Sequence, residues 1–98
     1  MNIVPRKIKF FNKGEALYEK ADYVKARLEF RNAVQIDPKF SDGYYILGMV
    51  ALKQDNFKGA IASFNRAIKQ SPEHLRSRLQ MGKLLVAGGR PDQAIEEA

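Results

Sequence analysis

The chain has 98 residues and no cysteine, and its 17 Lys and Arg against 11 Asp and Glu give a formal net charge of +6. The absence of cysteine excludes disulfides and thiolate metal sites, and it leaves the compartment open between the cytoplasm and a bacterial periplasm. No apolar run approaches the roughly 18 residues that a bilayer-spanning helix needs, so we expect no membrane span. The length corresponds to one small domain.

Apolar residues recur at intervals of three and four in successive segments, which predicts a series of amphipathic helices. The segments cover about 5–20, 23–36, 41–54 and 57–70, and a fifth runs from about 73 through Leu85. Pro91 is well placed as the first residue of a sixth helix, after a turn at 88–90. The chain therefore reads as consecutive helix pairs.

Polar residues and proline mark the breaks between these helices. Asp22 and Asp55-Asn56 interrupt the apolar pattern inside the first and second pairs. Asp37-Pro38 closes the first pair, because the residue before a proline is pushed out of the helical region. Ser41 follows and is expected to cap the next helix with its hydroxyl.

Small, aromatic and proline residues recur along the chain at an interval of 34. A fixed period in this range is typical of stacked repeats, whose units bury their apolar faces against their neighbours. We expect a single repeat domain over 1–98, with repeat 1 at 7–40, repeat 2 at 41–74 and a partial repeat 3 at 75–98. The recurring columns are Gly14, Gly48 and Gly82; Ala26, Ala60 and Ala94; Phe30 and Phe64; Ala33 and Ala67; Pro38 and Pro72.

The glycine column predicts a close contact between helices. Glycine inside a helix costs about 1 kcal/mol of helix stability relative to alanine. Three glycines at the same position of the repeat therefore indicate that another part of the chain packs closely there. The alanine column lies in the second helix of each pair, and we expect glycine to meet alanine within the pair. Phe30 and Phe64 are then expected to fill the seam to the next unit.

The middle unit resembles the tetratricopeptide repeat at several spaced positions, namely Tyr44, Leu47, Gly48, Ala60, Phe64, Ala67 and Pro72. The first unit keeps most of this pattern with Lys13 at the usual leucine, and the third has Arg78 at the aromatic position. The resemblance implies an all-α fold, an α-solenoid of antiparallel helix pairs in a right-handed superhelix. Whole segments such as 25–38 are also similar to long bacterial repeat proteins of the envelope and exopolysaccharide export type.

The third unit stops inside its second helix, where arrays of this family continue or add a capping helix. We therefore expect the chain to be a fragment of a longer array. Its last helix would leave Ala94 and Ile95 without a following unit. Such an open apolar end predicts self-association.

The polar residues form no catalytic or metal-binding pattern. His74 is the one histidine and is expected to be a solvated loop residue, and the serines show no nucleophile motif. No ligand cluster or phosphate-binding loop occurs either. We expect no enzyme activity and no cofactor. Arg6, Lys9 and Lys13 share a helical face, but acidic residues follow at once, so nucleic-acid binding ranks last among the alternatives.

The resemblance implies a concave groove, lined by the first helices of successive units, that holds a protein or peptide partner. At the groove positions this chain is more apolar than a solvated face requires. The predicted function is a non-catalytic scaffold that binds a peptide or a partner helix there, and the alternative is a structural spacer within a longer array. Whether the groove residues contact a partner or pack internally stays open. These residues are Phe11, Tyr18, Tyr45, Ile46, Met49, Leu52, Arg76 and Lys83.

Overall fold

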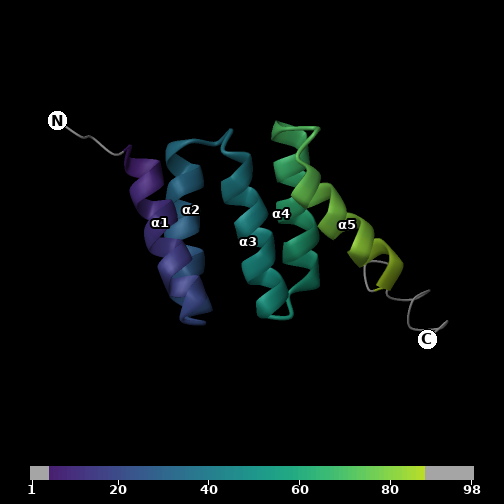
Figure 1. The fold of residues 1–98 in the computed structure, drawn as a ribbon, viewed down its shortest axis with the longest axis horizontal. Helices are drawn as coiled ribbons and strands as arrows, with labels where there is room; N and C mark the ends of the chain where they lie inside the picture. Colours follow the sequence, from purple (N-terminus) through teal and green to yellow (C-terminus); the bar gives the residue numbers. More distant parts are fainter. Residues whose placement is uncertain (1–4, 88–98) are drawn as a thin grey trace.

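The computed structural model describes residues 5–87, and this part of the chain contains five α-helices and no strand. The first helix of each pair packs against the second, α1 on α2 and α3 on α4, and contacts of α2 with α3 and of α4 with α5 join the pairs (Figure 1). The molecule is elongated, with extents of 57 × 29 × 17 Å. The bounds are Arg6–Glu19 for α1, Tyr23–Ile36 for α2, Ser41–Lys53 for α3, Phe57–Gln70 for α4 and Leu75–Ala87 for α5.

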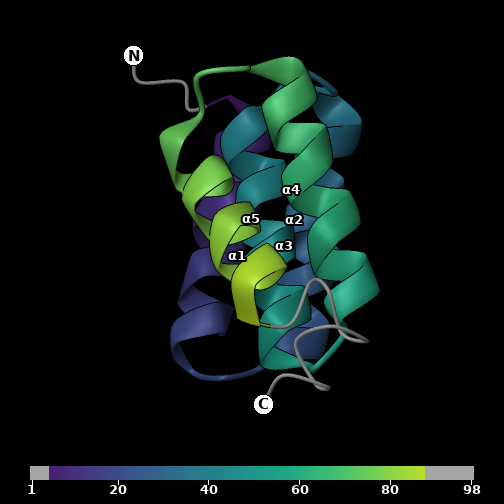
Figure 2. The same cartoon turned by 90° about the vertical axis from the view of Figure 1, so that its right-hand side faces the viewer.

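Successive pairs are stacked so that equivalent helices share a side of the molecule. Viewed along the stack, α2 and α4 lie on one side and α1 and α5 on the other (Figure 2). The prediction of an all-α helical repeat is therefore confirmed. The turn at 88–90 and the helix expected from Pro91 lie outside the described residues, and the division into units and the fragment hypothesis stay predictions.

The two helices of a pair are joined by a tight turn that ends one helix and caps the next. After α1, Ala21 takes a left-handed φ of 63°, and its N–H donates to the carbonyl of Tyr18 at 2.9 Å. The N–H of Asp22 donates to the carbonyl of Leu17 at 2.9 Å, which completes a Schellman ending. The Asp22 side chain then accepts from the Lys25 N–H at 3.3 Å and caps α2.

The second pair repeats this turn 34 residues later. Asp55 has a φ of 58°, and the side chain of Asn56 caps α4 by accepting from the Gly59 N–H at 3.0 Å. The sequence pattern marked Asp22 and Asp55-Asn56 as interruptions only. In the structure Asp55 takes the left-handed conformation that reverses the chain, and Asp22 and Asn56 cap the helices that follow.

The glycine column meets the phenylalanine column, and the nearest neighbours of Gly14 and Gly48 are phenylalanine rings, not the predicted alanines. A Cβ at Gly14 would lie 2.6 Å from Cε1 of Phe30, and a Cβ at Gly48 would lie 2.5 Å from Cε1 of Phe64. Both rings are fully buried. The ring reaches across the pair onto the glycine because it is the longest side chain in the second helix's buried stripe. Phe30 also shares a core cluster with Val50 of the next pair, so it reaches the seam as expected.

The start of α3 also differs from expectation. Ser41 is the first helical residue, the N-cap position is Phe40, and no side chain caps this end. The Phe40 ring is held by packing, with its centroid 5.2 Å from that of Phe11 and the Lys7 ammonium 4.8 Å above it. Packing therefore sets this helix boundary.

Candidate protein-interaction surface

The predicted groove residues come from the first helices of the three pairs. α1 carries Phe11 and Tyr18, and α3 carries the four central residues. All six apolar side chains are half-buried, whereas Arg76 and Lys83 on α5 are exposed. Lys83 borders an apolar hollow together with Leu79 and Val86. The predicted residues thus combine half-buried apolar groups with exposed cations.

Phe11 packs between the ring of Phe30 on α2 and the ring of Phe40 in the loop before α3. Its centroid lies 5.5 Å from that of Phe30 and 5.2 Å from that of Phe40, both in tilted contacts. Such offset aromatic pairs stabilise a core beyond the area they bury. A large part of the Phe11 side chain is therefore engaged in packing within the chain.

Tyr45 occupies the equivalent place 34 residues later and is packed in the same manner. Its ring centroid lies 5.9 Å from Phe64 of the same pair and 5.6 Å from His74, the residue before α5. The recurrence of both contacts at the repeat interval shows that this column closes the seam between units. The interpretation that some groove residues pack internally applies directly to Phe11 and Tyr45.

The remaining apolar groove residues also touch the core. Ile46 packs against the cluster that contains Phe30 and Val50, and Met49 and Leu52 pack against the cluster around Phe64. Each is only partly buried, so each keeps some surface for a partner.

Tyr18 makes an edge-on contact with Tyr23, with centroids 5.5 Å apart. Burial raises the pKa of the Tyr18 phenol, and the neighbouring phenols of Tyr23 and Tyr45 raise it further. The phenol therefore stays neutral over the physiological range and can take part in hydrogen bonds as donor or acceptor.

His74 is not the solvated loop residue that we expect from the sequence. Its side chain is only 12% exposed, and its Nε2 lies 2.7 Å from Oδ1 of Asp42. Its Nδ1 accepts from the Ser77 N–H at 3.3 Å and lies 2.9 Å from the Ser77 hydroxyl. Because Nδ1 accepts from a backbone N–H, the proton of the neutral ring sits on Nε2 and is donated to Asp42.

The order Asp42, His74, Ser77 is that of a hydrolase triad, but the geometry serves folding. Ser77 is fully buried in the first turn of α5, so no substrate can reach its hydroxyl. His74 stands directly before α5, where accepting the Ser77 N–H fulfils the role of an N-cap. The arrangement therefore fixes the start of α5 and links it to α3 through Asp42.

Of the basic residues expected to share a face on α1, Lys13 is ion-paired, and the neighbouring Lys7 is paired as well. The Lys13 ammonium lies 3.6 Å from a carboxylate oxygen of Glu29, and the Lys7 ammonium lies 2.5 Å from Oδ2 of Asp37. The hydrogen bond from Lys7, supported by one from the Lys39 N–H, holds the pKa of Asp37 below its usual range. These pairs leave fewer cations on α1 for phosphate binding than the sequence suggested.

Two further features are absent from residues 5–87. This part of the chain holds no group of three His, Cys, Asp or Glu side chains that could bind a metal ion. None of its helices combines the length and the apolar character that crossing a membrane requires.

Residues 51–98 match the family model of the tetratricopeptide repeat. The chain is also similar to the Protein CTR9 homolog of Arabidopsis thaliana, with 26% identity over 91 residues that cover 89% of this chain and 8% of that protein. It thus spans a small part of the length of this curated relative. The family match covers slightly less than half of the chain, and together with the five described helices it supports an all-α helical repeat. Tetratricopeptide repeats generally mediate protein–protein interaction and are typically non-catalytic. The relative is a plant protein, and the expected likeness to bacterial export proteins stays a prediction.

Proposed function

We propose that this chain is a protein-interaction scaffold that binds an extended peptide or a partner helix along the surface formed by α1, α3 and α5. The supporting observation is the row of half-buried apolar side chains on α3, Tyr45, Met49 and Leu52, together with exposed Lys83 on α5. Half-buried aromatic and thioether side chains held rigid by core contacts lose little entropy on binding, which favours a binding surface.

The test has two steps. A peptide that binds the immobilised chain is first selected from a displayed library, and this peptide is then titrated into ¹⁵N-labelled protein. We expect the amide shift changes to fall on α1, α3 and α5. A charge reversal at both exposed cations, Arg76→Glu with Lys83→Glu, should weaken binding about tenfold without loss of helicity. The matched control reverses Lys58 and Lys69 on α4, both exposed, and should bind as the wild type does.

Two outcomes would count against this proposal. If no peptide is selected, the alternative of a structural spacer within a longer array is favoured. In the relative from Arabidopsis thaliana the similar segment is 8% of a longer chain, which is the situation that this alternative describes. If single-stranded nucleic acid changes the same amide chemical shifts, nucleic-acid binding replaces peptide binding as the function of this surface.

We also propose a second copy of this chain as a partner at the α5 end. Leu75, Leu79 and Val86 on α5 are 75%, 56% and 75% exposed, and no described atom lies within 4 Å of a Cβ built on Gly82. An apolar surface of this kind favours association in water. Light scattering at rising concentration should show a dimer that Leu79→Glu with Val86→Glu abolishes, and a monomeric mass at every concentration would contradict it.

A further inference from the structure

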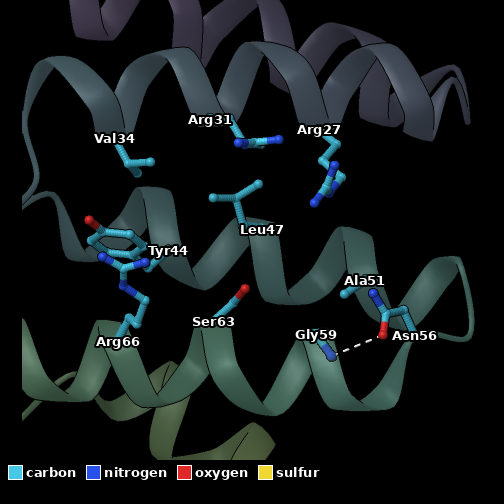
Figure 3. Close-up of a pocket in the computed structure, with 10 residues that line it drawn as sticks. All are labelled: Arg27, Arg31, Val34, Tyr44, Leu47, Ala51, Asn56, Gly59, Ser63 and Arg66. Atoms are coloured by element: carbon cyan, nitrogen blue, oxygen red, sulfur yellow. Dashed lines mark hydrogen bonds between the residues drawn. The ribbon is translucent and has the colours of Figure 1, made fainter.

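A cleft of about 260 Å³ lies between the second helices α2 and α4, with α3 as its floor. Tyr44, Leu47 and Ala51 form the floor (Figure 3). These positions recur at three- and four-residue spacing and so share a face of α3, which differs from the face that carries Met49. The cleft is therefore separate from the groove proposed above.

Three arginines surround this floor. Arg27 and Arg31 project from α2 toward α3, and Arg66 projects from α4 beside Tyr44 (Figure 3). The Arg66 guanidinium lies 4.9 Å from the centre of the Tyr44 ring, and this cation–π contact holds it over the floor. Two helices thus aim positive charge at one cleft.

The charge of these arginines is not balanced within the described part of the chain. The ion pairs of residues 5–87 involve Lys7, Lys13, Lys25 and His74, and none involves an arginine. The residues that line the cleft include no Asp or Glu. Since Arg27 and Arg31 lie four positions apart on one helix, their like charges destabilise the free helix. A bound anion would relieve this repulsion.

The cleft offers further features that suit an acidic side chain. Ser63 of α4 lines it, and its hydroxyl has no hydrogen bond among the described residues. Guanidinium groups bind carboxylates through two parallel N–H···O bonds, which gives both strength and geometry. The apolar floor of Tyr44 and Leu47 can in addition pack against the methylene groups of a glutamate.

We propose that this cleft binds an acidic peptide segment of a protein partner, with Asp or Glu carboxylates paired to Arg27, Arg31 and Arg66. Nucleic acid would need cations distributed along an extended face. Here the lysines at 7, 13 and 25 are already paired with carboxylates. Other exposed lysines such as Lys9, Lys20 and Lys53 lie outside the cleft, whereas three arginines that form no ion pair within residues 5–87 converge on it. A compact set of carboxylates fits this distribution better than a phosphate backbone.

The test is fluorescence anisotropy of a labelled hexaglutamate peptide at low ionic strength, with a labelled oligothymidylate of similar charge as the competitor class. The wild-type chain should bind the peptide, and added salt should weaken binding. Arg27→Gln with Arg31→Gln and Arg66→Gln should weaken it about tenfold or more. The double variant Arg27→Gln with Arg31→Gln keeps Arg66 and its contact with Tyr44. It should show most of the loss of peptide affinity, with unchanged helicity.

The control removes the same charge outside the cleft by Lys9→Gln, Lys20→Gln and Lys53→Gln, which are all exposed. It should change peptide affinity by less than about twofold, the effect of diffuse attraction alone. Equal losses in both triple variants would overturn the proposal, as would the absence of binding. Tighter binding of the oligonucleotide than of the peptide would also overturn it. Because groove binding is read from amide shift changes on α1 and α5, and cleft binding from substitution of arginines on α2 and α4, either proposal can fail alone.

Discussion

Gly48 lies against Phe64 so closely that a Cβ at this position would be 2.5 Å from the ring atom Cε1. Real side chains do not approach this closely, and Phe64 is fully buried and cannot move aside into solvent. The pair therefore requires glycine in α3 if α3 and α4 are to keep their separation. Gly14 and Phe30 form the same contact in the first pair, with a distance of 2.6 Å.

Gly48→Ala should consequently destabilise the chain by about 1–3 kcal/mol, the range for overpacking a core. Gly82→Ala is the matched control at the same phase of α5, where no described atom lies within 4 Å of the new Cβ. It should stabilise the helix by up to about 1 kcal/mol through propensity alone. Urea unfolding followed by circular dichroism measures both changes, and a similar sign for the two would refute the assignment.

Ala21 has a φ of 63°, a conformation that an L-residue with a Cβ adopts at a cost. Ala21→Gly should remove this strain and raise the free energy of unfolding by up to about 1 kcal/mol, after the entropy that glycine adds to the unfolded chain. Ala62→Gly, at an exposed position inside α4, should instead lose about 1 kcal/mol. Thermal melts of the two variants give the comparison, and a loss at both sites would contradict the strain argument.

His74 provides the described partner of the buried Ser77 hydroxyl as well as the cap of its N–H. His74→Ala should therefore destabilise the chain by about 1–3 kcal/mol, the cost of leaving a buried polar group without a partner. In a Ser77→Ala background the same substitution should cost less, giving an interaction energy of about 0.5 kcal/mol or more. Purely additive effects in this double-mutant cycle would show that the two side chains do not interact.

The ion pair of Lys7 with Asp37 predicts a pH dependence of stability. The folded pKa of Asp37 lies below its unfolded value, so the pair stabilises the chain above about pH 4, the usual Asp value. This contribution is lost as the pH falls through the lowered folded pKa.

Asp37→Asn keeps the side-chain oxygen that can accept from the Lys39 N–H and removes the charge that pairs with Lys7. Melting temperatures measured from neutral pH to about pH 2 should show wild type above the variant at neutral pH and convergence of the two in acid. The control Glu15→Gln removes an exposed carboxylate outside the ion pairs, so its melting temperature should follow that of the wild type at every pH. A gap that widens toward low pH would refute the assignment.

The sequence by itself determined the helices, their pairing and the repeat. Apolar spacing of three and four residues is a local signal, and the interval of 34 between Gly14 and Gly48 is visible without any structure. Helix bounds agree within about two residues for this reason. The resemblance to the family was enough to name the groove residues. It did not show which of them pack against the core and which stay exposed.

Only the tertiary structure decided which side chains meet. Glycine lies closest to phenylalanine, and His74 contacts Asp42 from a helix that begins more than thirty residues earlier. Arg27 and Arg66 come from different pairs, and nothing in their local sequence shows that they border one cleft. Such contacts depend on how helices stack in space, because the long-range packing that sets the separation and rotation of each helix is not encoded in its own periodicity.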